Sequence, residues 1–89
     1  MYHYLMTCPS QTQAMKASRV LAGAGIWNAV VKPPSDLLIN SCTHGVKIRS
    51  KDLQAGLRLL HRAGWNPITI YTAFSNGDYA PYQQGGEQP

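Results

Sequence analysis

Acidic side chains are scarce in this chain of 89 residues, which has four Asp and Glu against eight Lys and Arg. A reaction that relies on paired carboxylates as general acid and base is therefore not expected. The sequence also contains no glycine-rich nucleotide loop and no recognisable catalytic triad. These absences predict a protein that is not an enzyme. The net charge of +4 suits a partner with acidic groups.

Long apolar runs are missing as well. No segment approaches the roughly 20 apolar residues that a membrane-spanning helix requires, and no secretory signal opens the chain. We therefore expect a cytoplasmic protein without a membrane span. Only 13% of the residues are charged, so much of the surface is neutral. Such a surface is compatible with a face that a partner protein covers.

Cysteine is rare, and the two thiols, Cys8 and Cys42, are too few for a disulfide framework or a four-cysteine zinc site. Together with His44 they are ligand types that suit zinc or Cu(I). However, the chain has no Cys-x-x-Cys pair and these ligands are far apart in sequence, so no metal and no cofactor is expected. The thiols could be buried residues, a redox pair or separate reactive groups.

The residue pattern predicts four strands and two helices. Ser10 with Gln13 forms a capping box at the start of the first helix, and Gly25 ends it. Ser50 is expected to cap the second helix, which Gly64 ends in the same way. Aromatic, β-branched and alternating apolar residues predict strands over 2–6, 26–32, 45–49 and 67–72. From Ala73 onward the composition has no periodicity, which predicts an extended polar tail over 73–89.

The predicted order of elements is β-α-β-β-α-β. Residues 24–28 and 63–66 also repeat a similar Ala-Gly-Trp-Asn pattern, which favours two β-α units of similar build. Right-handed crossovers would place both helices on one face of a four-stranded antiparallel sheet. We therefore expect a single α+β domain over residues 1–72 with a ferredoxin-like fold and an open second sheet face.

Cys42 is the stronger candidate for a functional thiol because it lies in the loop before the third strand. His44 and the basic cluster Lys47, Arg49 and Lys51 follow it closely in sequence and would favour the reactive thiolate. Cys8 is a possible second thiol, since the turn after the first strand lies at the same end of the sheet. The alternative is that Cys42 is a small buried residue beneath the loop.

These residues resemble a family of small selenium/sulfur-carrier-like proteins over roughly residues 2–72. The resemblance rests on Tyr4-Leu5-Met6-Thr7 with Pro9-Ser10, on residues 21–26, on Ser41-Cys42 before Ile48-Arg49, and on Asp52-Leu53, Leu59-Leu60 and Ala63-Gly64. The family pattern implies that the cysteine before the third strand carries a persulfide or selenopersulfide. A glycine usually follows that cysteine, whereas here Thr43 and His44 precede Gly45.

The leading hypothesis is a carrier in which Cys42 holds sulfur or selenium, His44 orients or deprotonates the thiol, and the basic cluster docks a protein partner. The alternative is an accessory subunit of a larger complex that uses the open sheet face and the tail, with Tyr71, Tyr79 and Tyr82 as anchors. Nucleic acid is not an expected partner, because the third strand offers no aromatic side chains on which bases could stack.

Overall fold

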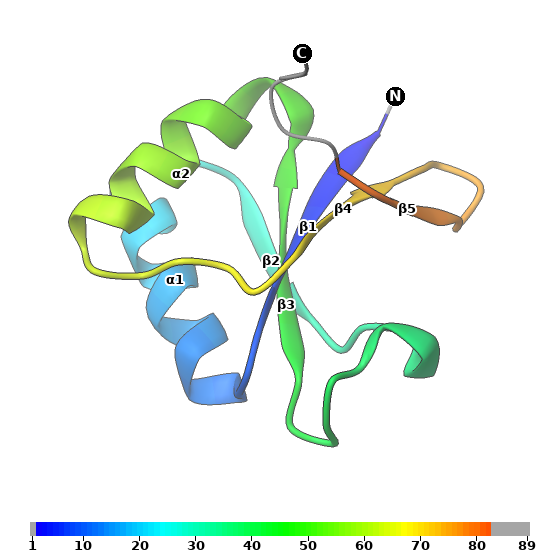
Figure 1. Ribbon diagram of the computed structural model, residues 1–89. Helices are drawn as coiled ribbons and strands as arrows, with labels where there is room; N and C mark the ends of the chain where they lie inside the picture. Colours follow the sequence, from blue (N-terminus) through cyan, green and yellow to red (C-terminus); the bar gives the residue numbers. More distant parts are fainter. Residues whose placement is uncertain (1, 83–89) are drawn as a thin grey trace, which may run out of the picture.

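The computed structural model describes residues 2–82 of the chain (Figure 1). Two helices and five strands follow one another in this part, with a short 3₁₀ turn before β3 (Ser35–Leu37, η1) and another after it (Ser50–Asp52, η2). The strands and helices are β1 (His3–Cys8), α1 (Gln11–Gly23), β2 (Asn28–Val31), β3 (His44–Arg49), α2 (Leu53–Arg62), β4 (Ile70–Ala73) and β5 (Tyr79–Pro81).

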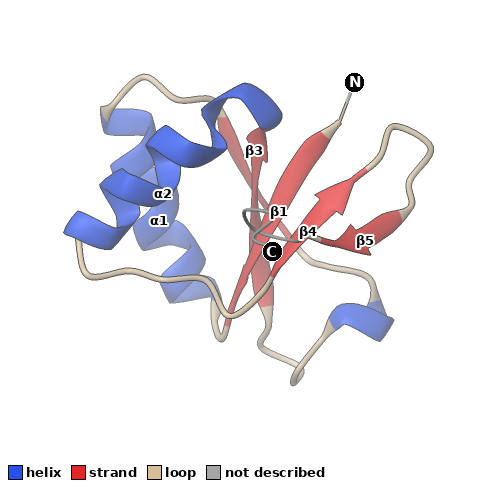
Figure 2. Cartoon of the chain, turned by 45° about the horizontal axis from the view of Figure 1, so that its top comes forward, coloured by secondary structure: helices blue, strands red, loops and turns tan. Residues whose placement is uncertain are grey.

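The strands form one open sheet in the order β2-β3-β1-β4-β5, in which every neighbouring pair is antiparallel. The first strand lies at the centre, where Met6 is opposite Val46 of β3 and Ile70 of β4. Both helices cover the same face of the sheet (Figure 2). The predicted α+β class, with two helices on one side of an antiparallel sheet, is confirmed.

The predicted sheet of four strands is one strand short. The additional strand, β5, lies within the segment that was expected to be a tail, and Thr72 of β4 is opposite Ala80 of β5. The turn between them is closed by a bond from the amide of Phe74 to the carbonyl of Asp78 (2.9 Å), and Gly77 has a φ of 93°. A strand of three residues is too short to produce a visible alternation, so periodicity could not reveal it. Residues 83–89 of the expected tail lie outside the described part.

Three of the four residues predicted to cap or end a helix do so in the structure. Ser10 Oγ accepts from the amide of Gln13 at 3.2 Å, as an N-cap does. Gly25 and Gly64 have φ values of 75° and 79°, which is the left-handed conformation that glycine adopts at low cost after a helix. The prediction for Ser50 was wrong: this residue opens η2, and α2 begins only at Leu53 without a side-chain cap.

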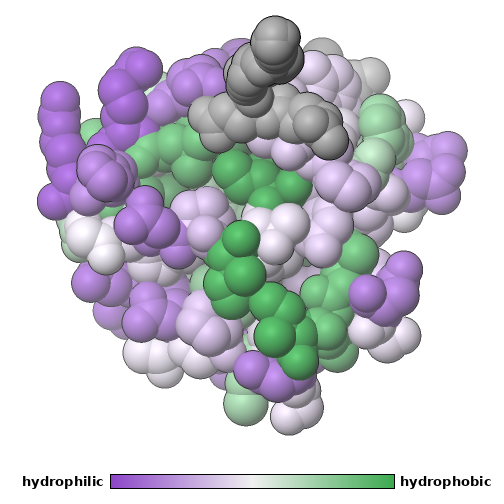
Figure 3. Space-filling model, in the orientation of Figure 1, coloured by the Kyte–Doolittle hydropathy of each residue, from purple (hydrophilic) through white to green (hydrophobic). Residues whose placement is uncertain are grey.

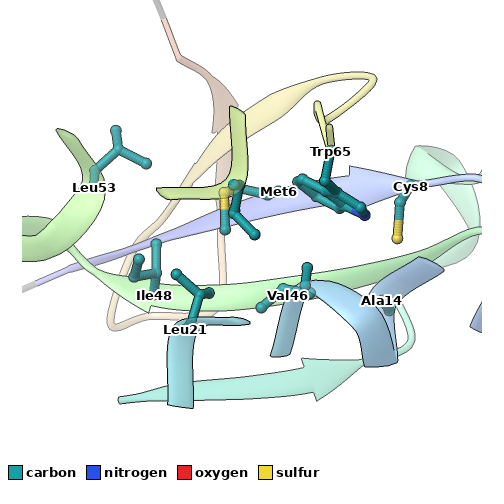
Figure 4. Packing of buried hydrophobic residues seen from close by; sticks show 10 residues of the cluster. Met6, Cys8, Ala14, Leu21, Val46, Ile48, Leu53 and Trp65 are labelled. Atoms are coloured by element: carbon teal, nitrogen blue, oxygen red, sulfur yellow. The ribbon is translucent and has the colours of Figure 1, made fainter. Parts of the chain in front are cut away.

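The hydrophobic core lies between the helices and the sheet (Figure 4). Met6, Val46 and Ile48 project from the central strands toward Leu21 of α1. Trp65 closes one end of this core, and its indole nitrogen donates to the carbonyl of Gln13 at 3.0 Å. Further fully buried members are Ala14, Ala17 and Leu60. No helix lies on the second face of the sheet, yet Leu5 and Thr7, which alternate with the helix-facing Met6 and Cys8 along β1, are buried there. The open second face expected from the sequence is therefore covered in part.

Candidate functional site

Cys42 lies in the loop that connects η1 to β3, and its thiol is free and exposed to solvent. The segment between β2 and β3 extends away from the helices, on the opposite side of the sheet (Figures 1 and 2). The loop has a defined hydrogen-bonded turn, in which Asn40 Oδ1 accepts from the amide of Cys42 at 2.8 Å. The amide of Thr43 donates to the carbonyl of Asn40 at 3.2 Å. This pattern presents the Cys42 thiol at a bend rather than beneath the loop.

Thr43 anchors this turn, and sequence reasoning did not identify it. Its side chain is fully buried, and its hydroxyl oxygen accepts from the amides of Ile39 and Asn40, both at 3.0 Å. Two backbone donors of an irregular loop are thereby satisfied by one side chain. The Asn-Ser-Cys-Thr sequence carried the signal for this turn, because Asn and Thr commonly bond to nearby backbone.

His44 and Lys32 hold the two sides of the Cys42 bend. His44 Nδ1 lies 2.7 Å from the carbonyl oxygen of Cys42, so this nitrogen carries a proton and donates it. Lys32 Nζ donates to the carbonyl of Ser41, the residue before Cys42. The structure thus places the His44 ring against the backbone carbonyl of Cys42. It adds Lys32, a basic residue directly after β2 that was not among the candidate site residues predicted from the sequence.

Two residues of the basic cluster expected to act on the thiol, Arg49 and Lys51, have their partners elsewhere. The six residues of β3 span roughly 17 Å of extended chain, with His44 at one end and Arg49 at the other. The guanidinium of Arg49 lies 5.2 Å from the centre of the Trp27 ring. Lys51 Nζ pairs with Asp52 at 3.3 Å. Lys47 lies between these ends. The structure does not gather Lys47, Arg49 and Lys51 around Cys42.

Cys8 is the last residue of β1, not part of a turn, and only 1% of its surface is exposed. Its Sγ lies 3.5 Å from the carbonyl oxygen of His44 and 3.6 Å from that of Ser10. Burial raises the pKa of the Cys8 thiol, and a backbone hydrogen bond with Ser10 opposes this rise only in part. The two cysteines form no disulfide. Cys8 is therefore a structural thiol, and the two residues are not joined as a redox pair.

The tyrosines predicted as tail anchors lie in the sheet or against it. Tyr71 belongs to β4 and is opposite Pro81, while Tyr79 begins β5 opposite Ala73. The Tyr82 ring packs on Tyr4 of β1 with ring centres 4.8 Å apart, and its amide donates to the carbonyl of Ile70 at 2.9 Å. Tyr82 thus stabilises this chain's own fold.

The surface also carries apolar side chains. Figure 3 shows them over the middle of the face seen in Figure 1, with hydrophilic side chains on the helix side. Ile68 and Ile39 are 47% and 60% exposed. Among residues 2–82, no helix is long and apolar enough to cross a membrane. No three His, Cys, Asp or Glu side chains gather there as a metal site either.

The fold and the loop together describe a small α+β domain that presents one exposed cysteine on a hydrogen-bonded turn. The chain belongs to the family described as "Putative Se/S carrier protein-like", whose model matches residues 3–72. The resemblance inferred from the sequence is thereby confirmed. No curated protein and no solved structure matches the chain. The family description suggests a carrier of selenium or sulfur, which is a non-catalytic role with protein partners.

Proposed function

We propose that Cys42 carries sulfur or selenium as a persulfide or selenopersulfide between a protein donor and a protein acceptor. One observation carries this proposal: of the two cysteines of the chain, Cys42 is exposed and Cys8 is buried. A carrier thiol must be reached by two successive partners, and only Cys42 meets this requirement. The family match over residues 3–72 supports the same role.

The transfer requires no external oxidant or reductant. In the loading step, the Cys42 thiolate attacks the outer sulfur of a donor persulfide, and the inner sulfur of the donor leaves as a thiolate. In the delivery step, an acceptor thiolate attacks the outer sulfur on Cys42, and the Cys42 thiolate leaves. Each step forms one bond to sulfur and breaks one, so electrons balance. Selenium in place of the outer sulfur follows the same sequence.

The residues around Cys42 have supporting roles in this proposal. His44 orients the loop through its bond to the Cys42 carbonyl, and the positive charge of Lys32 lies at the neighbouring peptide. Because Arg49 and Lys51 have their partners at the far end of β3, we assign the basic contact at the site to Lys32.

We do not propose a role as an accessory subunit of a larger complex as a second function. Tyr71, Tyr79 and Tyr82, the anchors that it required, lie in or against the chain's own sheet. We place the carrier on a ferredoxin-like β1–β4 unit to which β5 is added at the edge, and we propose that it acts in the cytoplasm.

The test is a loading reaction followed by intact-protein mass spectrometry. The full chain is incubated with glutathione persulfide under anaerobic conditions, and the mass and the modified peptide are determined. The wild type and Cys8→Ser should each gain one sulfur atom at residue 42, whereas Cys42→Ser should gain none. Sulfur found on Cys8, or equal loading of Cys42→Ser, would refute the proposal. Transfer to a second protein thiol is then measured with the loaded chain.

A further inference from the structure

A second candidate site lies at the end of β3 that is remote from Cys42. A cleft of about 420 Å³ is lined by Tyr2, His3, Arg49, Ser50 and Lys51. We name it the Arg49 cleft. None of its lining residues is acidic, and its basic side chains come from β1, β3 and η2. It shares no lining residue with the Cys42 loop, so the two sites are separate.

Trp27 adds an aromatic surface beside the Arg49 cleft. Its indole ring lies 5.4 Å from the His3 ring and 5.2 Å from the Arg49 guanidinium, measured between centres. The indole nevertheless remains 41% exposed. His3 is the register partner of Arg49, and Trp27 comes directly before Asn28, the partner of Ile48. The three side chains thus form a row from β1 across β3 to the residue that precedes β2.

We propose that the Arg49 cleft and Trp27 bind a nucleoside phosphate. Arg49 and Lys51 supply charge-assisted donors to the phosphate, and Ser50 supplies a hydroxyl. The base stacks on an exposed ring, which Trp27 and the 39%-exposed Tyr2 offer. A free nucleotide and a single-stranded RNA both present a phosphate and a base that could bind in this way.

The size and electrostatics of the cleft favour this class of ligand. Cavities of about 300–1,000 Å³ typically hold small ligands, and the cleft falls within this range. Inorganic phosphate alone would leave the aromatic surface unused. The carboxylate of Asp52 pairs with Lys51 at 3.3 Å but leaves that side chain 73% exposed. Arg49 and Lys51 therefore both remain accessible to an anion.

Nucleic acid was not an expected partner, because β3 carries no aromatic residue on which a base could stack. In the structure the ring comes from Trp27, directly before the neighbouring strand β2, and it lies under the guanidinium of Arg49 in β3. Trp27 and Arg49 are 22 positions apart in the sequence. They meet only because β2 pairs with β3. This inference does not depend on the proposed carrier role of Cys42.

The test uses the tryptophan fluorescence of the full chain. Trp27 is exposed and Trp65 is buried, so stacking on Trp27 should quench the exposed component of the emission. The protein is titrated with adenosine monophosphate, with a short single-stranded oligoadenylate and with inorganic phosphate. Adenosine monophosphate should quench and saturate, while inorganic phosphate should not. Quenching by the oligoadenylate alone would identify RNA as the source of the same chemical group.

Matched variants separate a built site from general charge attraction. Arg49→Gln should weaken binding about tenfold, and Trp27→Leu should remove the quench. Arg58→Gln removes the same charge from an exposed position on α2 and should leave the affinity unchanged. The absence of saturable binding to both nucleotide probes would overturn the proposal. Equal weakening by Arg49→Gln and Arg58→Gln would overturn it as well. Circular dichroism of each variant checks that the fold is retained.

Discussion

Cys8 and His44 are register partners at the end of the β1–β3 ladder, and the thiol of Cys8 contacts the carbonyl oxygen of His44 at 3.5 Å. The ring of the same histidine holds the carbonyl of Cys42. One residue therefore contacts a buried cysteine through its backbone and supports an exposed cysteine through its side chain. The two thiols share a neighbour but have opposite environments.

This difference predicts selective alkylation. Cys42 is exposed, whereas Cys8 is 1% exposed and burial raises its pKa. Because the thiolate is the form that reacts, iodoacetamide near neutral pH should modify Cys42 at least about 100-fold faster than Cys8. The measurement is time-resolved mass spectrometry with peptide mapping.

Unfolding provides the control for this experiment. In concentrated urea both cysteines should react at similar rates, because neither the burial nor the contact with His44 remains. Equal rates in the folded protein would contradict the description of Cys8 as a structural thiol.

Thr43 should determine the stability of the Cys42 loop. Thr43→Val keeps the shape of the side chain but leaves the amides of Ile39 and Asn40 without their acceptor. The expected loss is about 1–2 kcal/mol in the free energy of unfolding, measured by urea denaturation. Thr12→Val is the matched control, because Thr12 is exposed and the change should stay within about 0.5 kcal/mol.

Hydrogen exchange distinguishes a local from a global effect of this substitution. The amides of Ile39 and Asn40 should exchange faster in Thr43→Val, while amides of β1 keep their relative protection. Unchanged exchange at these two amides would show that the hydroxyl does not hold the loop.

Much of this architecture could be predicted from local chemistry. Ser10 and the glycines at 25 and 64 mark helix ends through their own backbone preferences, and alternation in 45–49 revealed the strand that places Val46 and Ile48 in the core. The resemblance also identified the family, whose model matches residues 3–72. These signals lie within a few residues of the feature that they predict.

The features that escaped prediction depend on contacts between distant segments. β5 forms only because β4 offers a free edge. The contact of Lys32 with the Ser41 carbonyl requires β2 and the loop to lie side by side. The basic residues of β3 were close to Cys42 in sequence, but an extended strand separates its ends in space. Proximity in sequence was therefore a poor guide to charge at the thiol.

The glycine after α2 offers a test of backbone strain without steric interference. Gly64 has a φ of 79°, and an added Cβ would meet no atom within 4 Å. Gly64→Ala should therefore lower the free energy of unfolding by about 1–2 kcal/mol through the left-handed conformation alone. Gly23, the last residue of α1, also has open space around it but no positive φ.

Gly23→Ala is accordingly the matched control for this change. It should leave stability unchanged or raise it by up to about 1 kcal/mol, because alanine favours a helix. Both variants are compared with the wild type by urea denaturation. If Gly64→Ala were as stable as Gly23→Ala, the left-handed turn after α2 would not be required.

Stability at alkaline pH should depend on Tyr4. Burial, followed by the hydrogen bond and charge of Tyr2 and the charge of Tyr82, raises the pKa of Tyr4 to about 12. An unfolded chain ionises this phenol near pH 10. Between about pH 10 and pH 12 the folded state therefore binds a proton that the unfolded state has lost. Its contribution to stability is complete below this window and is lost as the pH rises through it.

Tyr4→Phe removes this proton and should flatten the corresponding part of the stability curve. The free energy of unfolding, measured in urea between pH 9 and pH 12, should fall less steeply in Tyr4→Phe than in the wild type. The ultraviolet absorbance titration of the folded variant should also lack its latest tyrosine step, which Tyr71→Phe should retain. If Tyr4→Phe and the wild type lose stability in parallel across the window, burial against Tyr82 does not control the ionisation of Tyr4.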